Sequence, residues 1–82
     1  MKLYEFTGSW KTDNGYQVAY IYCNAKNKRE AEKIIHNSVP FHIDLDRMAK
    51  HNYSERHGND VTLWYFDNEK KEHHDTYKGV RI

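Results

Sequence analysis

The amino-terminal part of the chain constrains the fold most, because its apolar side chains recur at every second residue. Between Lys2 and Trp10 the aromatic residues share one parity and the polar residues share the other, namely Tyr4, Phe6 and Trp10 against Glu5, Thr7 and Ser9. This period is typical of a strand with one buried face. The turn tetrad TDNG, residues 12–15, comes next, and the β-branched and aromatic run YQVAYIYC, residues 16–23, follows it. The sequence therefore predicts a β-hairpin.

A helix is expected directly after this hairpin. Asn27 stands three residues before Glu30, which is the spacing of a capping box. Apolar residues then repeat at helical spacing from Ala31 until Pro40 ends the pattern. We therefore predict a first helix over about residues 28–37.

The segment PFHIDLD, residues 40–46, admits two interpretations. His42, Asp44 and Asp46 would share one face, as metal ligands must, if the backbone were extended through all three. A zinc site normally draws on more nitrogen and sulfur ligands than this cluster supplies. We therefore interpret Asp44 as the N-cap of a second helix over about 45–57. Its apolar stripe and its αL terminator are Leu45, Met48, Ala49, Tyr53 and Gly58.

The remaining chain contains two further strand patterns. DVTLWYF, residues 60–66, is rich in β-branched and aromatic residues, and DNEKKEHHD, residues 67–75, is expected to be a solvated connection. TYKGVRI, residues 76–82, is expected to be a short edge strand. The predicted fold is a single α+β domain over residues 1–82. It has a mainly antiparallel four-stranded sheet and two helices packed on one face, in the order ββααββ.

Two of the predicted strands are apolar on both of their faces. Two short helices can cover only one face of such a sheet, so the other face should expose apolar side chains. We assign the large aromatic residues to the core face: Tyr4, Phe6, Trp10, Tyr20, Trp64 and Phe66. The other face then holds Ile21, Leu63 and Tyr65, which we predict to form an exposed protein-binding surface. In the alternative, the C-terminal strand or the 67–75 connection folds across this face.

Charge and motif content argue against several classes of function. Thirteen basic and twelve acidic residues give a net charge of +1, whereas nucleic-acid-binding proteins usually concentrate positive charge. The sequence contains no GxSxG, HExxH, P-loop, CxxC or GxGxxG motif, and we expect neither a metal nor a cofactor. The single cysteine, Cys23, lies in an apolar run, which predicts a buried thiol in a reducing compartment.

The chain carries no obvious membrane-targeting pattern. No apolar stretch approaches the length of a transmembrane helix, and MKLYEFTG lacks the apolar core of a secretory signal. We therefore expect a cytoplasmic protein.

Two polar clusters keep nucleic-acid chemistry open as an alternative. His73, His74 and Asp75 could supply a ligand or a general base, although adjacent strand residues point to opposite faces. A small histidine-dependent ribonuclease would need two positioned histidines, and the chain has six. Four basic residues surround the start of the first predicted helix and could contact RNA phosphates: Lys26, Lys28, Arg29 and Lys33. Because glutamates are interleaved with them, a solvated helix face is the preferred interpretation.

The stretch KLYEFTGSWKTDNGYQVAYIYCNAKNKREAEKII, a hairpin leading into a capped helix, resembles the layout of short accessory proteins of T4-like phages. These include antitoxins and other inhibitors of host defence nucleases. The resemblance covers about the first half of the chain and assigns no functional residue. It implies a non-enzymatic protein that inhibits or sequesters a host or defence-system protein by occluding its working surface. If the chain is phage-encoded, it would act in the bacterial cytoplasm. Self-association as a homodimer and RNA binding are the alternative partnerships.

Overall fold

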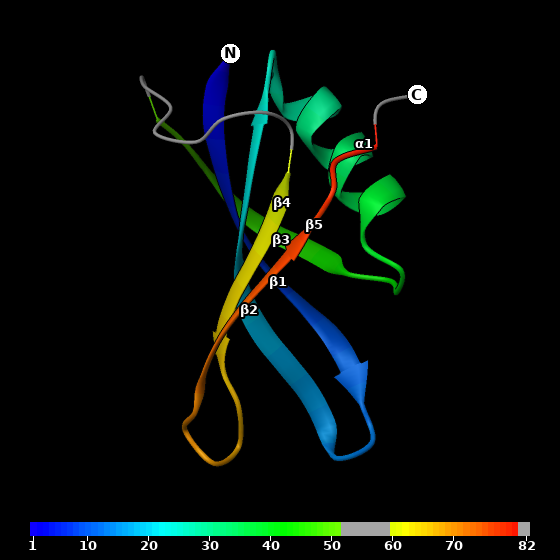
Figure 1. The fold of residues 1–82 in the computed structure, drawn as a ribbon, viewed down its shortest axis with the longest axis vertical. Helices are drawn as coiled ribbons and strands as arrows, with labels where there is room; N and C mark the ends of the chain where they lie inside the picture. Colours follow the sequence, from blue (N-terminus) through cyan, green and yellow to red (C-terminus); the bar gives the residue numbers. More distant parts are fainter. Residues whose placement is uncertain (52–59, 81–82) are drawn as a thin grey trace.

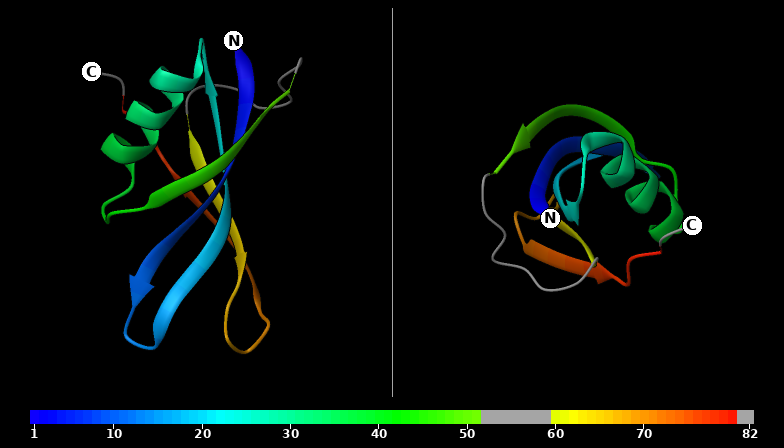
Figure 2. Two further views of the ribbon diagram at one scale, coloured as in Figure 1. Left: turned by 180° about the vertical axis from the view of Figure 1, so that it is seen from behind. Right: turned by 90° about the horizontal axis from the view of Figure 1, so that it is seen from above.

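The computed structural model describes residues 1–51 and 60–80. Within these ranges the elements are, in chain order, β1 (Lys2–Thr12), β2 (Gly15–Ala25), α1 (Lys28–Ser38), β3 (Asp44–Lys50), β4 (Val61–Phe66) and β5 (Glu72–Tyr77). The strands form one sheet in the order β3-β1-β2-β4-β5, and every neighbouring pair is antiparallel (Figure 1). The sheet is strongly curved, and α1 lies on its concave side, as the view from above shows (Figure 2).

The predicted first hairpin is confirmed, and its turn sets the register of the sheet. Thr12 pairs with Gly15, so only Asp13 and Asn14 lie between the two strands. Gly15 has a φ of 132°, a value that residues other than glycine rarely adopt. From this turn the pairing runs the full length of both strands and places Phe6 opposite Ile21. Directly paired residues point to the same face of a sheet.

The predicted first helix is also confirmed, and Asn27 is its N-cap as expected, although the Glu30 carboxylate reaches the residue before the cap instead of Asn27 itself. The Asn27 side chain accepts a 2.8 Å hydrogen bond from the backbone N–H of Glu30. The Glu30 carboxylate accepts one of 3.1 Å from the backbone N–H of Lys26. The apolar stripe of α1, which is Ala31, Ile34 and Ile35, is buried against the sheet. We call the sheet face beneath α1 the inner face and the opposite one the outer face.

The predicted second helix is wrong in the part that the structure describes. Residues Asp44–Lys50 form strand β3 instead and pair with β1 along one edge of the sheet. Asp44 therefore caps no helix, and its carboxylate lies 2.8 Å from Nε2 of His42. The remainder of the predicted helix, residues 52–57, and its terminator Gly58 lie outside the described residues.

A β-bulge explains why this strand has a helix-like pattern. Leu45 is opposite Gly8 and Met48 is opposite Phe6, so two steps along β1 correspond to three steps along β3. A bulge inserts one extra residue in this way and leaves the residues on either side of it on the same face. The three-residue spacing of Leu45 and Met48 therefore reflects an irregular strand and not a helical turn.

The expected four-stranded sheet with two helices is thus corrected to a five-stranded sheet with one helix within the described residues. The last strand is also shifted from its predicted position. β5 contains EHHD from the segment that was expected to be a solvated connection, and only residues 67–71 connect it to β4. Those charged and imidazole side chains suit an edge strand, because edges exposed to water are commonly protected by charge.

The assignment of faces in β2 and β4 is wrong as well. Ile21 and Leu63 are fully buried beneath α1, at 0% exposure, and Tyr65 packs against the same core. Tyr20, Trp64 and Phe66 lie instead on the outer face. The reason is the two-residue turn, which pairs even-numbered residues of β1 with odd-numbered residues of β2. Tyr4 and Phe6, by contrast, are core residues as expected, and Trp10 packs against the core.

Two further expectations concern Cys23 and the lipid bilayer. Cys23 is buried in the core, as predicted, and its thiol donates a 3.4 Å hydrogen bond to the backbone carbonyl oxygen of Asn24. Within the described ranges, no helix has both the length and the apolar character needed to cross a bilayer.

Candidate binding surface

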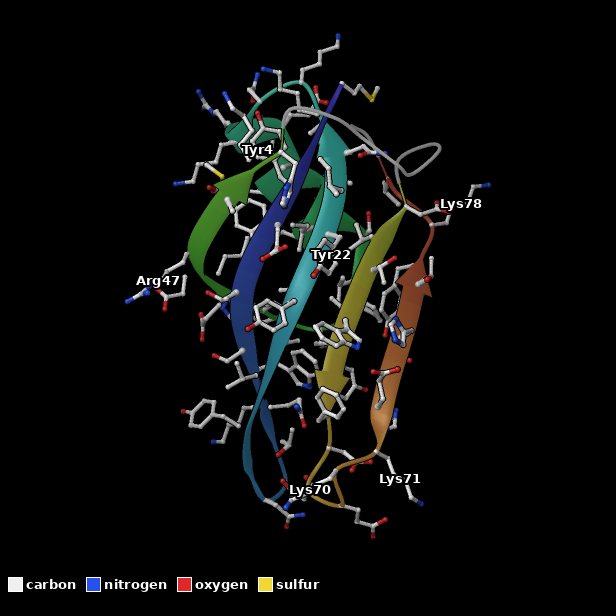
Figure 3. All side chains as sticks on the ribbon, turned by 90° about the vertical axis from the view of Figure 1, so that its left-hand side faces the viewer. Tyr4, Tyr22, Arg47, Lys70, Lys71 and Lys78 are labelled. Carbon is white, nitrogen blue, oxygen red and sulfur yellow. The ribbon has the colours of Figure 1, made fainter. Side chains whose placement is uncertain are left out.

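The outer face carries a row of rings that crosses three strands. Tyr20 of β2 is directly opposite Trp64 of β4, which is opposite His74 of β5. The Tyr20 and Trp64 rings stack with centroids 5.5 Å apart and planes 25° apart, and the centroids of Trp64 and His74 are 6.1 Å apart. Figure 3 looks onto this face, with α1 behind the sheet and Tyr22 near its centre. Cross-strand aromatic pairs of this kind stabilise a sheet and also present broad apolar surface.

Large apolar side chains beside this row are exposed to solvent. The most exposed residues of this patch are Tyr16 at 71%, Val18 at 65%, Phe66 at 53% and Tyr20 at 43%. Single exposed apolar side chains are ordinary, but these belong to adjacent strands and adjoin one another. We call Tyr16, Val18, Tyr20, Trp64 and Phe66 the aromatic patch.

A hollow of about 390 Å³ lies within the aromatic patch. β2 lines it with residues 16–20 and β4 with residues 64–66, and Thr7 and Asn68 complete the lining. None of these side chains carries a formal charge. In Figure 3, the labelled basic residues Arg47, Lys70, Lys71 and Lys78 lie around the margin of the outer face. The centre of this face is therefore neutral and apolar.

The hollow lies where the two hairpins of the sheet separate. β2 and β4 pair only at Tyr20, Ile21 and Tyr22, and below this point the β1–β2 and β4–β5 hairpins diverge toward their tips (Figures 1 and 2). The side-chain amide of Gln17 bridges the start of the gap. Its Nε2 donates to the carbonyl oxygens of Val18 at 3.0 Å and Phe66 at 2.8 Å.

Glu72 adjoins the patch beside Trp64. A hydrogen bond with His74 and the nearby Trp64 indole lower the pKa of the Glu72 carboxyl below its usual range. The indole N–H is buried and, among the described residues, makes no hydrogen bond, so the 3.0 Å bond between His74 and Glu72 is the cause that the geometry supports. A carboxylate therefore borders the aromatic patch at neutral pH.

The inner face also carries a polar network, which is centred on Tyr65. Its hydroxyl donates to Asp75 at 2.8 Å, its ring stacks on His73 at 4.8 Å, and it contacts the Trp10 ring edge-on at 5.1 Å. Burial, followed by the hydrogen bond to Asp75, raises the pKa of Tyr65 to about 12. The phenol is therefore neutral at physiological pH and serves as a hydrogen-bond donor rather than as a base.

Asp67 organises the tip of the β4–β5 hairpin. Its carboxylate accepts hydrogen bonds from the backbone N–H groups of Glu69 at 2.8 Å and Lys71 at 2.9 Å, and it also pairs with His73 at 2.8 Å. The bond with His73, followed by the bond from Lys71, lowers the pKa of Asp67. His73 therefore belongs to a structural turn network.

The predicted histidine pair does not come together. His73 lies on the inner face beside Tyr65, and His74 lies on the outer face beside Trp64. Another pair does meet, because His36 and His42 stack with ring centroids 6.2 Å apart. Carboxylates of Glu32, Asp44 and Asp46 share their hollow of about 280 Å³, together with Lys28. This balance of charge disfavours a phosphate group.

The predicted phosphate-binding residues are divided between two sides of α1. Lys28 forms an ion pair with Glu32 at 3.7 Å. Arg29 and Lys33 line a different hollow, of about 470 Å³, together with Glu30, and Lys26 is exposed before the helix. These residues therefore form no single basic site.

In the PFHIDLD segment, residues 44–46 belong to β3, whereas residues 40 and 41 lie in bends, so the segment is not one continuous strand. His42 pairs directly with Asp44, and both side chains are largely exposed. Among the residues that the structure describes, no three His, Cys, Asp or Glu side chains are placed to hold one metal ion.

The predicted binding residues and the observed patch are on opposite faces of the sheet. Ile21 and Leu63 are inaccessible in the folded chain, whereas Tyr20, Trp64 and Phe66 of the aromatic patch had been assigned to the core. The signal that would have found the patch was already present in the TDNG turn. A two-residue turn makes Thr12 and Gly15 partners, and counting back from that pair places Tyr20 opposite Thr7 on the polar side of β1.

Comparisons of the chain with protein-family models, with curated proteins and with solved structures find no match. The assignment of function therefore depends on the site itself.

Proposed function

We propose that this chain is a non-enzymatic binding protein that uses the aromatic patch to cover the working surface of a partner protein. The single observation that carries the proposal is the exposure of Tyr16, Val18, Tyr20 and Phe66 around an uncharged hollow. Tyrosine and tryptophan supply large contact areas at low entropic cost and dominate protein–protein interfaces. An apolar patch of adjoining side chains usually marks such an interface.

The charge distribution favours a protein partner over RNA. Stacking of bases on aromatic rings occurs on sheet faces, but affinity for nucleic acid also requires cations that contact the phosphates. The hollow has no basic side chain, and the Glu72 carboxylate stands beside Trp64. A phosphate backbone would therefore meet neutral or negative surface at the centre of the patch.

The identity of the partner follows from the layout-level resemblance alone. It points to a host or defence-system protein in the bacterial cytoplasm, sequestered by a phage-type accessory protein. A homodimer formed through the same patch is the competing partnership, and both would bury the same side chains.

The test is affinity capture from bacterial lysate with wild-type protein and with Val18→Glu and Phe66→Glu variants. Both residues are more than half exposed, so the variants should keep the wild-type circular dichroism spectrum. We expect binding of the captured protein to weaken by about 2 kcal/mol, or roughly thirtyfold, if these positions are interface anchors. Light scattering of the purified protein distinguishes self-association from capture of another chain.

The control is Lys33→Glu, which also introduces a glutamate, here on the exposed side of α1, and changes the net charge by two units instead of one. Equal affinity of all three variants for the captured partner would contradict the proposal. Loss of binding only in Lys33→Glu, with a steep dependence of a gel shift on salt, would support RNA binding instead.

A further inference from the structure

We propose that the segment contacting the patch is an extended polypeptide that adds as a β-strand to the open edge of β2 at Gly15–Ala19, between the two hairpins. This inference rests on the proposed function and specifies its chemistry. The partner would contribute a short strand whose backbone binds β2 and whose alternate side chains cover the aromatic patch.

The open edge follows from the pairing of β2. All of β2 pairs with β1, but its opposite edge pairs with β4 only from Tyr20 to Tyr22. In a hairpin with a two-residue turn, the pair that closes the turn is hydrogen-bonded, and such pairs then alternate along the ladder. The odd-numbered residues of β2 therefore direct their backbone groups toward β1. The backbone N–H and C=O groups of Tyr16 and Val18 point toward the gap.

Gln17 shows which chemistry the gap accepts. Its primary amide donates to the backbone carbonyl oxygens of Val18 and Phe66, one on each side of the gap. A carboxamide is the side-chain equivalent of a peptide group, so Gln17 takes the place that a strand backbone would occupy. An entering strand would displace this amide and bond to the same carbonyl oxygens. The gap is now narrow enough for one side-chain amide to bond both carbonyl oxygens. The two hairpins would therefore have to move apart to admit a strand.

This edge differs from the two outer edges of the sheet in its lack of protection. β3, with the sequence DLDRMAK, and β5, with the sequence EHHDTY, carry charged or imidazole side chains along most of their length. Such side chains discourage the pairing of edges between chains. The open stretch of β2, GYQVA, carries no charge at all.

The lining of the gap indicates the sequence of the segment. Its middle would lie over Val18, Tyr20 and Phe66, where apolar side chains fit the uncharged hollow. Toward the hairpin tips the gap continues into a second hollow of about 340 Å³, bordered by Asp67 and Glu69, whose carboxylates also pair with His73 at 2.8 Å and with Lys71 at 3.4 Å. The complementary segment therefore alternates apolar residues and carries a lysine or arginine at the end that lies near the tips.

The probe is a capped synthetic peptide with alternating threonine and valine residues and one terminal lysine, made with the lysine at either end. Its matched control is the same peptide with N-methyl groups on alternate residues, which removes the strand's N–H donors and leaves its side chains. Titrations are followed by the backbone amide signals of the intact protein in NMR spectra. We expect shifts at Tyr16, Val18 and Phe66, and at least about tenfold weaker binding of the N-methylated peptide.

A protein variant tests the same edge from the other side. Val18→Pro removes an N–H that faces the gap and spares the pairing with β1, because proline is tolerated where the N–H of a strand faces outward. It should abolish peptide binding, whereas Val18→Ala should retain most of it. If Val18→Pro does not fold, Gln17→Ala provides the second test. Removal of the competing amide should leave peptide affinity equal or higher. A loss of affinity would contradict the proposal that the peptide displaces the Gln17 amide.

Failure of this inference can be distinguished from failure of the proposed function. Equal binding of both peptides, or binding of neither, would overturn strand addition. The proposed function would stand in either case if Val18→Glu still weakened capture of the lysate partner. If Val18→Glu left that capture unchanged, the patch would not be the interface and both proposals would fall.

Discussion

The two faces of the sheet are built from the same strands, yet one is covered by α1 and the other is exposed to solvent. On β2, Ala19, Ile21 and Cys23 are buried beneath α1, whereas Val18 and Tyr20 point away from the helix into solvent. Both sets are apolar, so hydrophobicity does not decide which becomes core. The side on which α1 packs and the register of the hairpin decide it. An apolar set of side chains left outside the core in this way is available to a partner.

The largest effect on stability is expected when a buried side chain on the inner face is truncated. Leu63→Ala should lower the free energy of unfolding by about 3 kcal/mol, because it removes a fully buried side chain and leaves a cavity. Urea unfolding followed by circular dichroism measures the change. A cost below about 1 kcal/mol would mean that Leu63 is not part of the core. A charged residue at this position should unfold the protein, instead of only weakening binding as the sequence had suggested.

A second test concerns how closely the inner face is packed. Gly8→Ala should destabilise the protein by about 2 kcal/mol, because overpacking forces neighbouring groups apart. The added Cβ would lie 2.6 Å from Cδ1 of Ile21 and 3.0 Å from the backbone oxygen of Asp44. Ser9→Ala, one residue along on the outer face, is the control and should change stability little. Equal thermal unfolding of both variants would show that Gly8 is not tightly enclosed.

The third test weakens the helix that makes the inner face a core. Asn27→Ala removes the N-cap of α1 and should cost about 1 kcal/mol. Lys28→Ala, the adjacent exposed substitution, removes only a surface ion pair and should cost less than about 0.5 kcal/mol. Thermal unfolding of the two variants separates these effects. Similar values would indicate that the cap contributes no more than an ordinary surface contact.

The fourth test uses alkaline pH to examine the polar network centred on Tyr65. The pKa of Tyr65 is raised from 10.0 to about 12, so the folded chain holds the phenol proton more tightly than the unfolded chain. Stability from this group is complete below pH 10 and is lost as the pH rises toward about 12, because ionisation then favours the unfolded state. Since the side chain is partly exposed, we expect a loss of less than about 1 kcal/mol.

Urea unfolding across this pH window provides the measurement, and Tyr65→Phe is the control, since it should lose the part of the dependence that Tyr65 contributes. An identical profile for both proteins would show that Tyr65 titrates in the same way in the folded and unfolded chains.

The smallest effect is expected on the outer face. Val18→Ala should change stability by less than about 0.5 kcal/mol, because its side chain is 65% exposed. The contrast with Leu63→Ala, a substitution of another apolar residue in the same sheet, measures the difference between the faces directly. A comparable cost at both positions would mean that the outer face is already covered in the isolated protein, for instance by a second copy.

The candidate site was less predictable than the local elements around it. The expectation that one sheet face would expose apolar residues rested on a count of four strands and two helices that was wrong, although the outer face does expose such residues. Which residues compose it did not, because the parity of β2 was assigned by the size of its side chains and not by counting from the turn. The histidine pair of His36 and His42 was also beyond sequence reasoning, since it joins the end of α1 to the loop before β3.

Local sequence by itself determined the first hairpin, the cap and length of α1, and the burial of Cys23. Each depends on interactions between near neighbours: a two-residue turn, a side chain that bonds an amide three residues on, and a run of alternating apolar residues. These signals hold wherever the segment lies in the fold.

Only the tertiary structure decided that residues 44–50 form a strand and that the hairpins diverge below Tyr20. The free edge of β1 offers backbone hydrogen bonds that a segment with mixed propensity satisfies by extending, and a bulge then accommodates its helix-like spacing. The gap between the hairpins depends on where β4 stops pairing with β2, far away in sequence. Such pairings join segments that are far apart in sequence and depend on how the whole sheet assembles. The surface that we propose for binding can therefore be identified only from the tertiary structure.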